Sequence, residues 1–431
     1  MSSTRRLRSG LGAAAAAIIA VASVAPAAAA HPNRDDDSRS EFFVPRPNQD
    51  AVRQIAALRA DGQKADAALI REMVQTPQAV WIESNSPREA QLQVRQITRV
   101  AAAKRQLPVL VAYNIPFRDC AQYSAGGATT VAEYEAWIDA VAAGIGPRDA
   151  IVILEPDGLG IIPWYTPLGA AGPEWCQPAE ADPETAATDR FALLNHAVEV
   201  LTALPNTAVY LDGTHSGWLG VADISDRLIK AGVTEADGFF LNASNYQETE
   251  RQLTYGDWIS QCIHLDQNSW WDRSWCASQY YPADPADFDT WSASDAAYDQ
   301  AYADTGLARD PATMPHYVID TSRNGQGPWT PPPGVYPDPQ DWCNPPGRGL
   351  GERPTADTGN PLADAYLWIK IPGESDGLCL RGTDGPEDPA RDMIDPAAGE
   401  WFPEQALELA HLADPELQVD APPAKGRGNR R

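Results

Sequence analysis

The sequence predicts an α/β fold in which seven parallel strands close into a barrel within a single domain. Seven short runs are apolar almost throughout, as strands buried on both faces of a parallel sheet are. Between them lie segments whose apolar residues recur every three or four positions, which indicates helices. No long Ser/Thr/Pro linker divides the 431 residues. An open parallel sheet is the alternative, but the repeated order of strand then helix favours the closed barrel.

The strand runs are rich in β-branched and aromatic residues. They are VWIE from Val80, PVLVAYNIP from Pro108, AIVILEP from Ala150, TAVYLDG from Thr207, GFFLNAS from Gly238, HYVIDTS from His316 and DAYLWIK from Asp364. The clearest helical periods span residues 131–144 and 184–204. Residues 261–315 are rich in Trp, Tyr, Asp and Pro, and we expect them to form a large loop excursion over one face.

Residues 1–30 have the pattern of an export signal, with arginines first, then an alanine-rich apolar stretch, then the small residues 28–30. A membrane anchor is the alternative, and the adjacent Arg5 and Arg6 are weakly indicative of twin-arginine export. We therefore expect a secreted, extracellular protein. Its other segments are expected to be a flexible leader at 31–44, the barrel at 45–415 and a disordered tail at 416–431.

The charge balance excludes some classes of partner. The chain carries 59 acidic and 33 basic residues, which argues against nucleic acid and anionic membranes. No second apolar run is long enough to span a bilayer, so no membrane association is expected once the signal is removed. We also expect a monomer.

Six cysteines in an exported chain indicate three disulfides, for which the sequence alone permits 15 pairings. Metal ligation is the alternative, but no CxxC or His-rich spacing favours it. We therefore expect neither a metal nor a cofactor.

Polar residues follow nearly every strand run. Asp119 follows the second run, Asp157 the third, Asp212 the fourth and Asp376 the seventh. The carboxyl ends of the strands of a parallel barrel form one mouth, so we expect these four aspartates to converge there. A single aspartate at a strand end is more often a helix cap, but four from separate strands favour a shared site.

Carboxyl groups packed together repel one another, so one keeps its proton to higher pH and can act as a general acid. Hydrolysis of a glycosidic bond needs this division, with one carboxyl protonated and another ionised. Four aromatic residues at or just past strand ends could stack on sugar rings: Trp81, Tyr113, Trp218 and Trp342. A tryptophan is more often a core residue, but a chain with 14 of them has some to spare for a groove.

At these residues the sequence resembles glycoside hydrolase family 6, the cellulases that comprise inverting endoglucanases and cellobiohydrolases. The matching blocks follow the family's order and span most of residues 45–412. They are YNIPFRDC (113–120), LEPDGLG (154–160), YLDGTHSGWLG (210–220), NASNY (242–246), IDTSRNG (319–325), DWCN (341–344) and WIKIPGESDG (368–377). The resemblance implies a distorted, TIM-like barrel of seven parallel strands, in agreement with the seven runs. It also implies β-1,4-glucan, as cellulose or cello-oligosaccharides, as the substrate.

The resemblance assigns catalytic roles to five residues. Asp157 matches the general acid that protonates the departing glycosidic oxygen. Asp119 matches an aspartate that raises the pKa of the acid and relays a proton from the attacking water. Asp376 matches a proposed base or charge stabiliser, and Asp212 a further aspartate that contacts substrate. Tyr113 would crowd the sugar at the cleavage point and favour a distorted ring.

The resemblance also implies binding subsites and disulfides. The expected substrate-binding residues are Trp81, Trp342, Lys370 and Glu374 on the donor side, His215 and Trp218 on the acceptor side, and Arg118 and Asn245 at strand ends. Family precedent pairs Cys120 with Cys176 and Cys343 with Cys379, which leaves Cys262 with Cys276. The first two bonds would brace the loops that carry Asp119 and Asp376.

Departures from the family pattern favour cleavage of internal bonds. The loop from Asp376 to Trp401 is short for an enzyme that roofs a tunnel, and Val221 stands where cellobiohydrolases often have a tryptophan. The Pro-rich insert 326–341 instead favours the alternative, a cellobiohydrolase. Gly158, where Ser or Ala is usual, is not expected to disturb proton transfer.

Two other classes are less favoured. A non-catalytic glucan-binding protein would have lost one of the aspartates, and all four are present. A metal-dependent hydrolase would need closely spaced ligands, and the six histidines lie far apart. A weak calcium site built from loop carboxylates stays open as an alternative.

Overall fold

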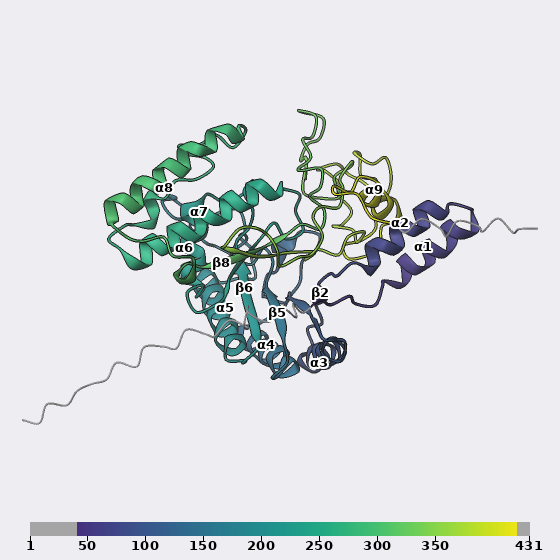
Figure 1. Cartoon of the computed structure of the whole chain (residues 1–431), viewed down its shortest axis with the longest axis horizontal. Coiled ribbons are helices and arrows are strands. Elements are labelled where there is room, and N and C mark those ends of the chain that lie inside the picture. Colours follow the sequence, from purple (N-terminus) through teal and green to yellow (C-terminus); the bar gives the residue numbers. More distant parts are fainter. Residues whose placement is uncertain (1–40, 420–431) are drawn as a thin grey trace, which may run out of the picture. The chain divides into compact units, whose positions relative to one another are not determined.

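Seven parallel strands form one curled sheet in the computed structural model, which describes residues 41–419 (Figure 1). The strands pair in chain order, so each strand lies beside its predecessor and its successor. They are β2 (Val80–Ile82), β4 (Val109–Ala112), β5 (Ala150–Leu154), β6 (Thr207–Asp212), β7 (Gly238–Leu241), β8 (His316–Asp320) and β9 (Ala363–Leu367). The predicted distorted barrel of seven parallel strands is confirmed.

The barrel has a seam between its first and last strands. Within residues 41–419 no strand pairing joins β2 to β9. Two hydrogen bonds cross the seam instead: the Ala79 N–H donates to the Trp368 carbonyl (2.9 Å), and Trp81 Nε1 donates to the Ile369 carbonyl (2.9 Å). The seam therefore places Trp81 next to the end of β9.

Alternate residues of each strand pack on opposite faces of the sheet. On β4, Val109 and Val111 belong to the cluster inside the barrel, whereas Leu110 and Ala112 pack against the outer helices. Side chains alternate along any strand, so a strand covered on both sides must be apolar at every position. This explains why the runs read as continuous apolar stretches.

Helices cover the outer face of the sheet, and further helices lie near both ends of the described chain. They are α1 (Gln49–Ala60), α2 (Lys64–Gln75), α3 (Pro87–Lys104), α4 (Val131–Ile145), α5 (Ala186–Thr202), α6 (Val221–Lys230), α7 (Thr249–Asn268), α8 (Ser292–Thr305) and α9 (Pro403–His411). The helices predicted at 131–144 and 184–204 are confirmed as α4 and α5. Thr130 starts α4 because its side chain accepts a hydrogen bond from the Glu133 N–H. None of the described helices has the length and apolar character that a membrane span requires.

The segment 261–315 was expected to be a loop excursion, and this expectation is wrong in part. It contains the end of α7 and all of α8, which pack together through Trp258. The Trp258 ring lies 5.1 Å from that of Trp291 and 6.5 Å from that of Tyr298, centroid to centroid. The polar residues of α8 hid its apolar face, because aromatic rings rather than aliphatic side chains form the contact.

The ends of the described chain are more ordered than the predicted boundaries at 45 and 415 imply. Residues Glu41–Phe42 form β1, which pairs with β3 (Gln106–Leu107), and Leu417 is buried. Helices α1, α2 and α9 lie together, purple beside yellow in Figure 1. His411 of α9 forms an ion pair with Asp66 of α2. The predicted signal 1–30 lies outside the described residues.

Candidate active site

A cleft of about 560 Å³ opens at the carboxyl ends of the strands. All but one of the predicted catalytic and substrate-binding residues line it. They are Trp81, Tyr113, Arg118, Asp119, Asp157, His215, Trp218, Asn245, Trp342, Lys370, Glu374 and Asp376. The exception is Asp212.

Tyr113, directly after β4, is held between the side chains of Trp81 and Arg118. Its ring meets the Trp81 ring edge to face at 5.0 Å between centroids, and the Arg118 guanidinium lies 4.2 Å from its centroid. The buried carboxylate of Glu155 accepts hydrogen bonds from the N–H groups of Asn114 and Ile115, which take the place of the sheet ladder there. Burial and the nearby carboxyls of Asp119 and Asp157 raise the pKa of Tyr113 well above its usual value. The phenol therefore stays protonated in the cleft.

Asp157 stands at a tight turn after β5, with a left-handed backbone (φ 61°). The buried Arg190 fixes this turn, because its guanidinium donates to the carbonyls of Gly158, Ile161 and Pro116. Burial raises the pKa of Asp157 well above its usual value, and the charges of Asp212, Asp119 and Asp376 raise it further. The side chain therefore keeps its proton to higher pH than an ordinary aspartate does.

Asp119 reaches the cleft from the loop after β4. Its Oδ2 accepts a hydrogen bond from the Ser124 N–H (2.9 Å), and the next residue, Cys120, is disulfide-bonded to Cys176. Burial raises the pKa of Asp119 to about 6, against the opposing effects of Ser124 and Arg118. Asp119 can therefore gain or release a proton in the mildly acidic range.

Asp376 has the opposite environment. Burial would raise its pKa, but Arg323 and Lys370 outweigh burial, and the pKa is lowered. Its Oδ2 accepts from Arg323 Nη1 (2.8 Å), from the Tyr246 hydroxyl (3.2 Å) and from the Asn344 N–H (3.0 Å), and Lys370 Nζ lies 3.4 Å from Oδ1. Asp376 is therefore ionised, and its carboxylate is held in one place.

Asp212 lies beneath the cleft and does not line it. Its carboxylate accepts hydrogen bonds from the N–H groups of Leu159, Gly160 and Thr214. Asp212 is therefore the one predicted catalytic or substrate-binding residue whose side chain is not part of the lining of the cleft. Instead, Asp212 supports the turn that carries Asp157 and adds a negative charge close to it.

The expected donor-side residues gather along the seam of the barrel. Lys370 and Glu374 follow β9, and Trp81 lies across the seam from them. Glu374 Oε1 accepts a hydrogen bond from Asn48 Nδ2 (3.1 Å), so the chain before α1 supports this wall. The Trp342 ring lies 6.1 Å from the Tyr123 ring, centroid to centroid.

The expected acceptor-side residues come from the turns after β6 and β7. The rings of His215 and Trp218 lie 5.7 Å apart, and Trp218 packs directly against the backbone of Gly160. Burial lowers the pKa of His215 to about 4, so the imidazole is neutral. Its Nδ1 accepts from the Gly217 N–H, which leaves Nε2 as the donor toward the cleft.

Sequence reasoning missed several residues of this site. Trp175 and Trp329 line the cleft, and Trp175 is 56% exposed. Both come from irregular loops, where no periodicity marks a side chain as facing the cleft. Tyr246 and Arg323 bind Asp376, although each lies far from it in the chain. They belong to the NASNY and IDTSRNG blocks, which were the available signal.

All three disulfides have the pairing that the resemblance implied: Cys120–Cys176, Cys262–Cys276 and Cys343–Cys379. The first and third hold the loops of Asp119 and Asp376. The second joins α7 to the segment that follows it.

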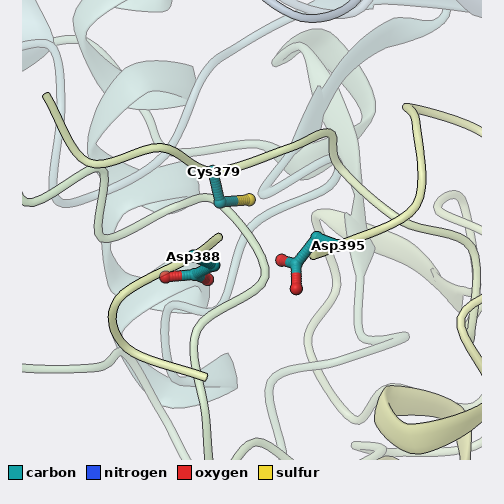
Figure 2. Close-up of side chains that lie close together, drawn as sticks. All are labelled: Cys379, Asp388 and Asp395. Atoms are coloured by element: carbon teal, nitrogen blue, oxygen red, sulfur yellow. The ribbon is translucent and has the colours of Figure 1, made fainter. Parts of the chain in front are cut away.

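One further group of side chains could be taken for a metal site. Figure 2 shows Cys379, Asp388 and Asp395 gathered around one buried space, with their possible ligand atoms within 4.8 Å of one another. The Cys379 sulfur is bonded to Cys343 and is not a thiolate, which is the form that binds metals. Arg381 already pairs with Asp388. This donor set does not fit a resident metal ion.

A sequence model of the family described as "Glycosyl hydrolases family 6" matches residues 37–413. "Endoglucanase A" of Cellulomonas fimi is 34% identical over 349 residues, which cover 81% of this chain and 57% of that protein. "Probable 1,4-beta-D-glucan cellobiohydrolase C" of Aspergillus fumigatus is 31% identical over 336 residues, which cover 72% of this chain and 62% of that protein. The chain thus spans less than two thirds of the length of these two relatives.

A solved structure has the same fold along nearly its whole length. It is the endoglucanase Cel6 from Mycobacterium tuberculosis in complex with methyl-cellobiosyl-4-deoxy-4-thio-β-D-cellobioside. The two chains are 33% identical, with a TM-score of 0.62, and the match covers 87% of this chain and 98% of that chain.

Proposed function

The chain belongs to glycosyl hydrolase family 6 and is a glycoside hydrolase, and from this premise we propose that it is a secreted, inverting β-1,4-glucanase that cuts internal bonds of cellulose. The observation that carries the proposal is that two carboxyls in one cleft have pKa values shifted in opposite directions. The pKa of Asp157 is raised, whereas that of Asp376 is lowered. Near neutral pH one group is an acid and the other an anion, which glycosidic hydrolysis requires.

In the proposed reaction Asp157 donates its proton to the departing glycosidic oxygen. Water attacks the anomeric carbon from the opposite face and gives an inverted product. Asp119, with its pKa near 6, takes a proton from this water through a short relay, and the carboxylate of Asp376 stabilises the positive charge that develops on the sugar ring. Tyr113, held by Trp81 and Arg118, presses on the ring at the cleavage point.

Replacement of the acid tests this proposal. Asp157→Ala should lower the hydrolysis of unactivated cello-oligosaccharides by about 10²–10⁴-fold, because the leaving oxygen loses its proton donor. A substrate with a dinitrophenolate leaving group needs no proton and should lose far less rate. Asp149→Ala is the matched control, since Asp149 is exposed at the other end of β5. An equal loss on both substrates would remove Asp157 from the acid role.

The segment after Asp376 supports cleavage of internal bonds. Between Asp376 and Trp401, the described residues that line the cleft are only Ala398 and Gly399. This segment folds back on itself, with the Ser375 N–H donating to the Glu400 carbonyl, and it provides little cover for the cleft. A glucan chain could then enter from the side rather than by an end.

A cellobiohydrolase is the second candidate, because the Pro-rich insert 326–341 does approach the cleft. Its Trp329 lines the cleft, and its Gln340 Oε1 accepts a hydrogen bond from the Tyr123 hydroxyl (3.1 Å). Tyr123 also accepts from the Leu380 N–H (2.8 Å), so three loops meet at this side chain. These contacts would help to enclose a substrate.

The viscosity of carboxymethylcellulose separates the two modes. Internal cleavage should lower viscosity rapidly while few reducing ends appear. If cellobiose accumulates while viscosity stays high, the chain acts from ends instead. NMR of the first product on a soluble oligosaccharide should show the α-anomer, and the β-anomer would contradict inversion.

We also propose that the protein is extracellular and acts as a monomer. All six cysteines are paired in disulfides, which is typical of proteins in oxidising compartments. Size-exclusion chromatography of the culture medium would test both statements.

A further inference from the structure

Asp376 is held by a residue that never reaches the cleft. The Asn344 N–H donates to Asp376 Oδ2 (3.0 Å), and the Asp376 N–H donates to Asn344 Oδ1 (2.8 Å). This reciprocal pair fixes both the carboxylate and the backbone of Asp376. The orientation of the Asn344 side chain therefore controls the position of Asp376.

The Asn344 amide is held by Ser375 Oγ (2.9 Å), by the Gly377 carbonyl (2.9 Å) and, at the shortest distance, by Asp395. Asn344 has a left-handed backbone (φ 38°), and its Nδ2 donates to Asp395 Oδ2 (2.8 Å). Both side chains are buried, as is Gln405 of α9, whose Nε2 donates to Asn344 Oδ1 (3.0 Å). A chain of hydrogen bonds thus runs from Asp395 through Asn344 to Asp376.

Asp395 lies against a second buried carboxyl group, that of Asp388 (Figure 2). Arg381 forms a double hydrogen bond with Asp388, from Nε to Oδ1 (2.7 Å) and from Nη2 to Oδ2 (2.9 Å). Asp395 has no such cation, and no N–H or O–H group of the described residues donates to its Oδ1. One oxygen of each carboxyl lies within 4.8 Å of the other, and two neighbouring carboxyls can hydrogen-bond to each other only if one of them carries a proton.

The charges around Asp395 agree with this arrangement. Burial, Asp388 and the hydrogen bond to Asp388 raise its pKa, Asn344 and Arg391 oppose them, and the result is about 7. Arg391 is drawn toward α9, where its Nη2 pairs with Glu408 (2.8 Å). The other charged group nearby is Asp376 itself, on the far side of Asn344.

We propose that Asp395 is a protonated positioning residue, which shares its proton with Asp388 and so holds Asn344 in the orientation that supports Asp376. Loss of the proton would place two anions side by side in a buried space. The Asp376 segment would then loosen, although Asp376 and Asp157 themselves are unchanged. This proposal rests on the proposed function for its kinetic consequence, but the shared proton itself can be tested without substrate.

Asp395→Asn is the decisive variant, because asparagine mimics the protonated acid and cannot ionise. Its carbonyl can accept from Asn344, and its amide can donate to Asp388. Asp392→Asn is the matched control, as it makes the same change at an exposed position of the same loop. All three proteins should fold at pH 6. Failure of Asp395→Asn to fold there would overturn the proposal, since the replacement reproduces the proposed native state.

Thermal unfolding tests the shared proton. Native Asp395 keeps a proton that the unfolded chain releases near pH 4, so wild-type stability falls as pH rises from about 4 to about 7. Asp395→Asn should show a smaller fall in Tm over this window, and Asp392→Asn the same fall as wild type. Identical slopes for wild type and Asp395→Asn would overturn the proposal.

Kinetics with a dinitrophenyl β-cellobioside test the link to Asp376, because this substrate does not need the proton of Asp157. The wild-type kcat should drop about tenfold from pH 6 to pH 8 as Asp395 ionises, whereas that of Asp395→Asn should change less than twofold. Coincident profiles, with the expected Tm slopes, would overturn the positioning role and leave the proposed function intact. If neither wild type nor either variant hydrolyses the substrate, the proposed function is contradicted. The dependence of Tm on pH would still test the shared proton.

Discussion

The ionisation of Asp376 depends on a few individual side chains. Burial alone would raise the pKa of this residue, and Arg323 and Lys370 reverse that effect. Arg323 is itself fully buried and also donates to the Ser244 carbonyl, so it cannot turn away from Asp376. The ionised state of Asp376 therefore depends on its cationic partners more than on its buried position.

Removal of one donor from Asp376 should shift the acid side of the pH profile. Tyr246→Phe deletes the hydroxyl that donates to Asp376 Oδ2 and leaves the ring in place. The pKa of Asp376 should rise, because the ionised form loses a hydrogen bond. Asp119 sets a first loss of kcat/KM on a cello-oligosaccharide near pH 6, and the further loss at lower pH that follows protonation of Asp376 should move upward by up to about one pH unit.

Tyr298→Phe is the control for this change. Tyr298 is equally buried, and its hydroxyl donates to the Ala277 carbonyl away from the cleft. If the step at lower pH stays in place in Tyr246→Phe, or moves equally in Tyr298→Phe, the assignment is contradicted.

Single residues were predictable from sequence where they follow a strand or lie in a block that matches the family, as Trp342 does. Asp119, Asp157 and Asp376 were expected in one cleft because their strands were recognisable, and the cleft contains them. Asp212 is the last residue of β6, yet its carboxylate accepts from backbone N–H groups instead of lining the cleft, and no sequence pattern distinguishes these outcomes. Trp329 reaches the cleft from a loop whose path depends on contacts of the kind that Arg381 makes with Pro339 and Gln340.

At the scale of loops and helices, two disulfides brace the segments that carry Asp119 and Asp376, the carboxyls proposed to assist catalysis. Cys120 and Cys176 are 56 residues apart and join the Asp119 loop to the loop after β5. Cys262 and Cys276 are 14 residues apart and lie in and after α7, outside the cleft. A comparison of the Cys120–Cys176 bond with the Cys262–Cys276 bond can therefore distinguish an effect on stability from an effect on the cleft.

Paired serine replacements should show this difference. Cys120→Ser with Cys176→Ser, and Cys262→Ser with Cys276→Ser, should each lower the free energy of unfolding by about 2–4 kcal/mol. The loss should be about 1 kcal/mol larger for the first pair, whose closed loop is longer. Only the first pair should lower kcat at temperatures where both proteins are folded. Equal kcat values for the two double variants would show that the Cys120–Cys176 bond does not position Asp119.

Elements were predictable where one pattern dominates. Five of the seven strands begin at the predicted residue, and β4 and β9 begin one residue away. Helix α8 was missed because Asp and Ala are frequent in it and its contacts are made by Tyr298 and the neighbouring Trp291. Its position depends on α7, which is tertiary information that a local pattern does not contain.

For the whole molecule, several buried acids have raised pKa values. Burial raises the pKa of Asp119 to about 6 and that of Glu155 to about 7. The native protein thus holds protons that the unfolded chain releases near pH 4, so stability should fall as pH rises from about 4 to about 7. The formal net charge of −26 acts in the same direction, because acidic groups on the surface repel one another more as they ionise.

We therefore expect a higher Tm at pH 5 than at pH 8. Added salt should recover only part of the difference, because it screens exposed charges and not buried acids. Calorimetry at both pH values would separate the contribution of the surface charges from that of the buried acids. It is done with and without about 0.5 M NaCl, which shortens the screening length to a few ångströms. A Tm that is constant or rises from pH 5 to pH 8 would contradict the expectation.

The seam of the barrel has a consequence for the order in which the protein can form. Asn48 and Glu374, which are hydrogen-bonded to each other at the donor wall, are 326 residues apart in the sequence. Strands β4 to β8 can pair one after another as synthesis proceeds. The hydrogen bond from Trp81 to the Ile369 carbonyl can form only after Ile369 has been synthesised, so this wall of the cleft forms late. A nascent chain would therefore form the turns that carry Asp157 and Trp218 early, and the wall of Trp81 and Glu374, which we propose to bind the donor sugar, would be the last part of the cleft to form.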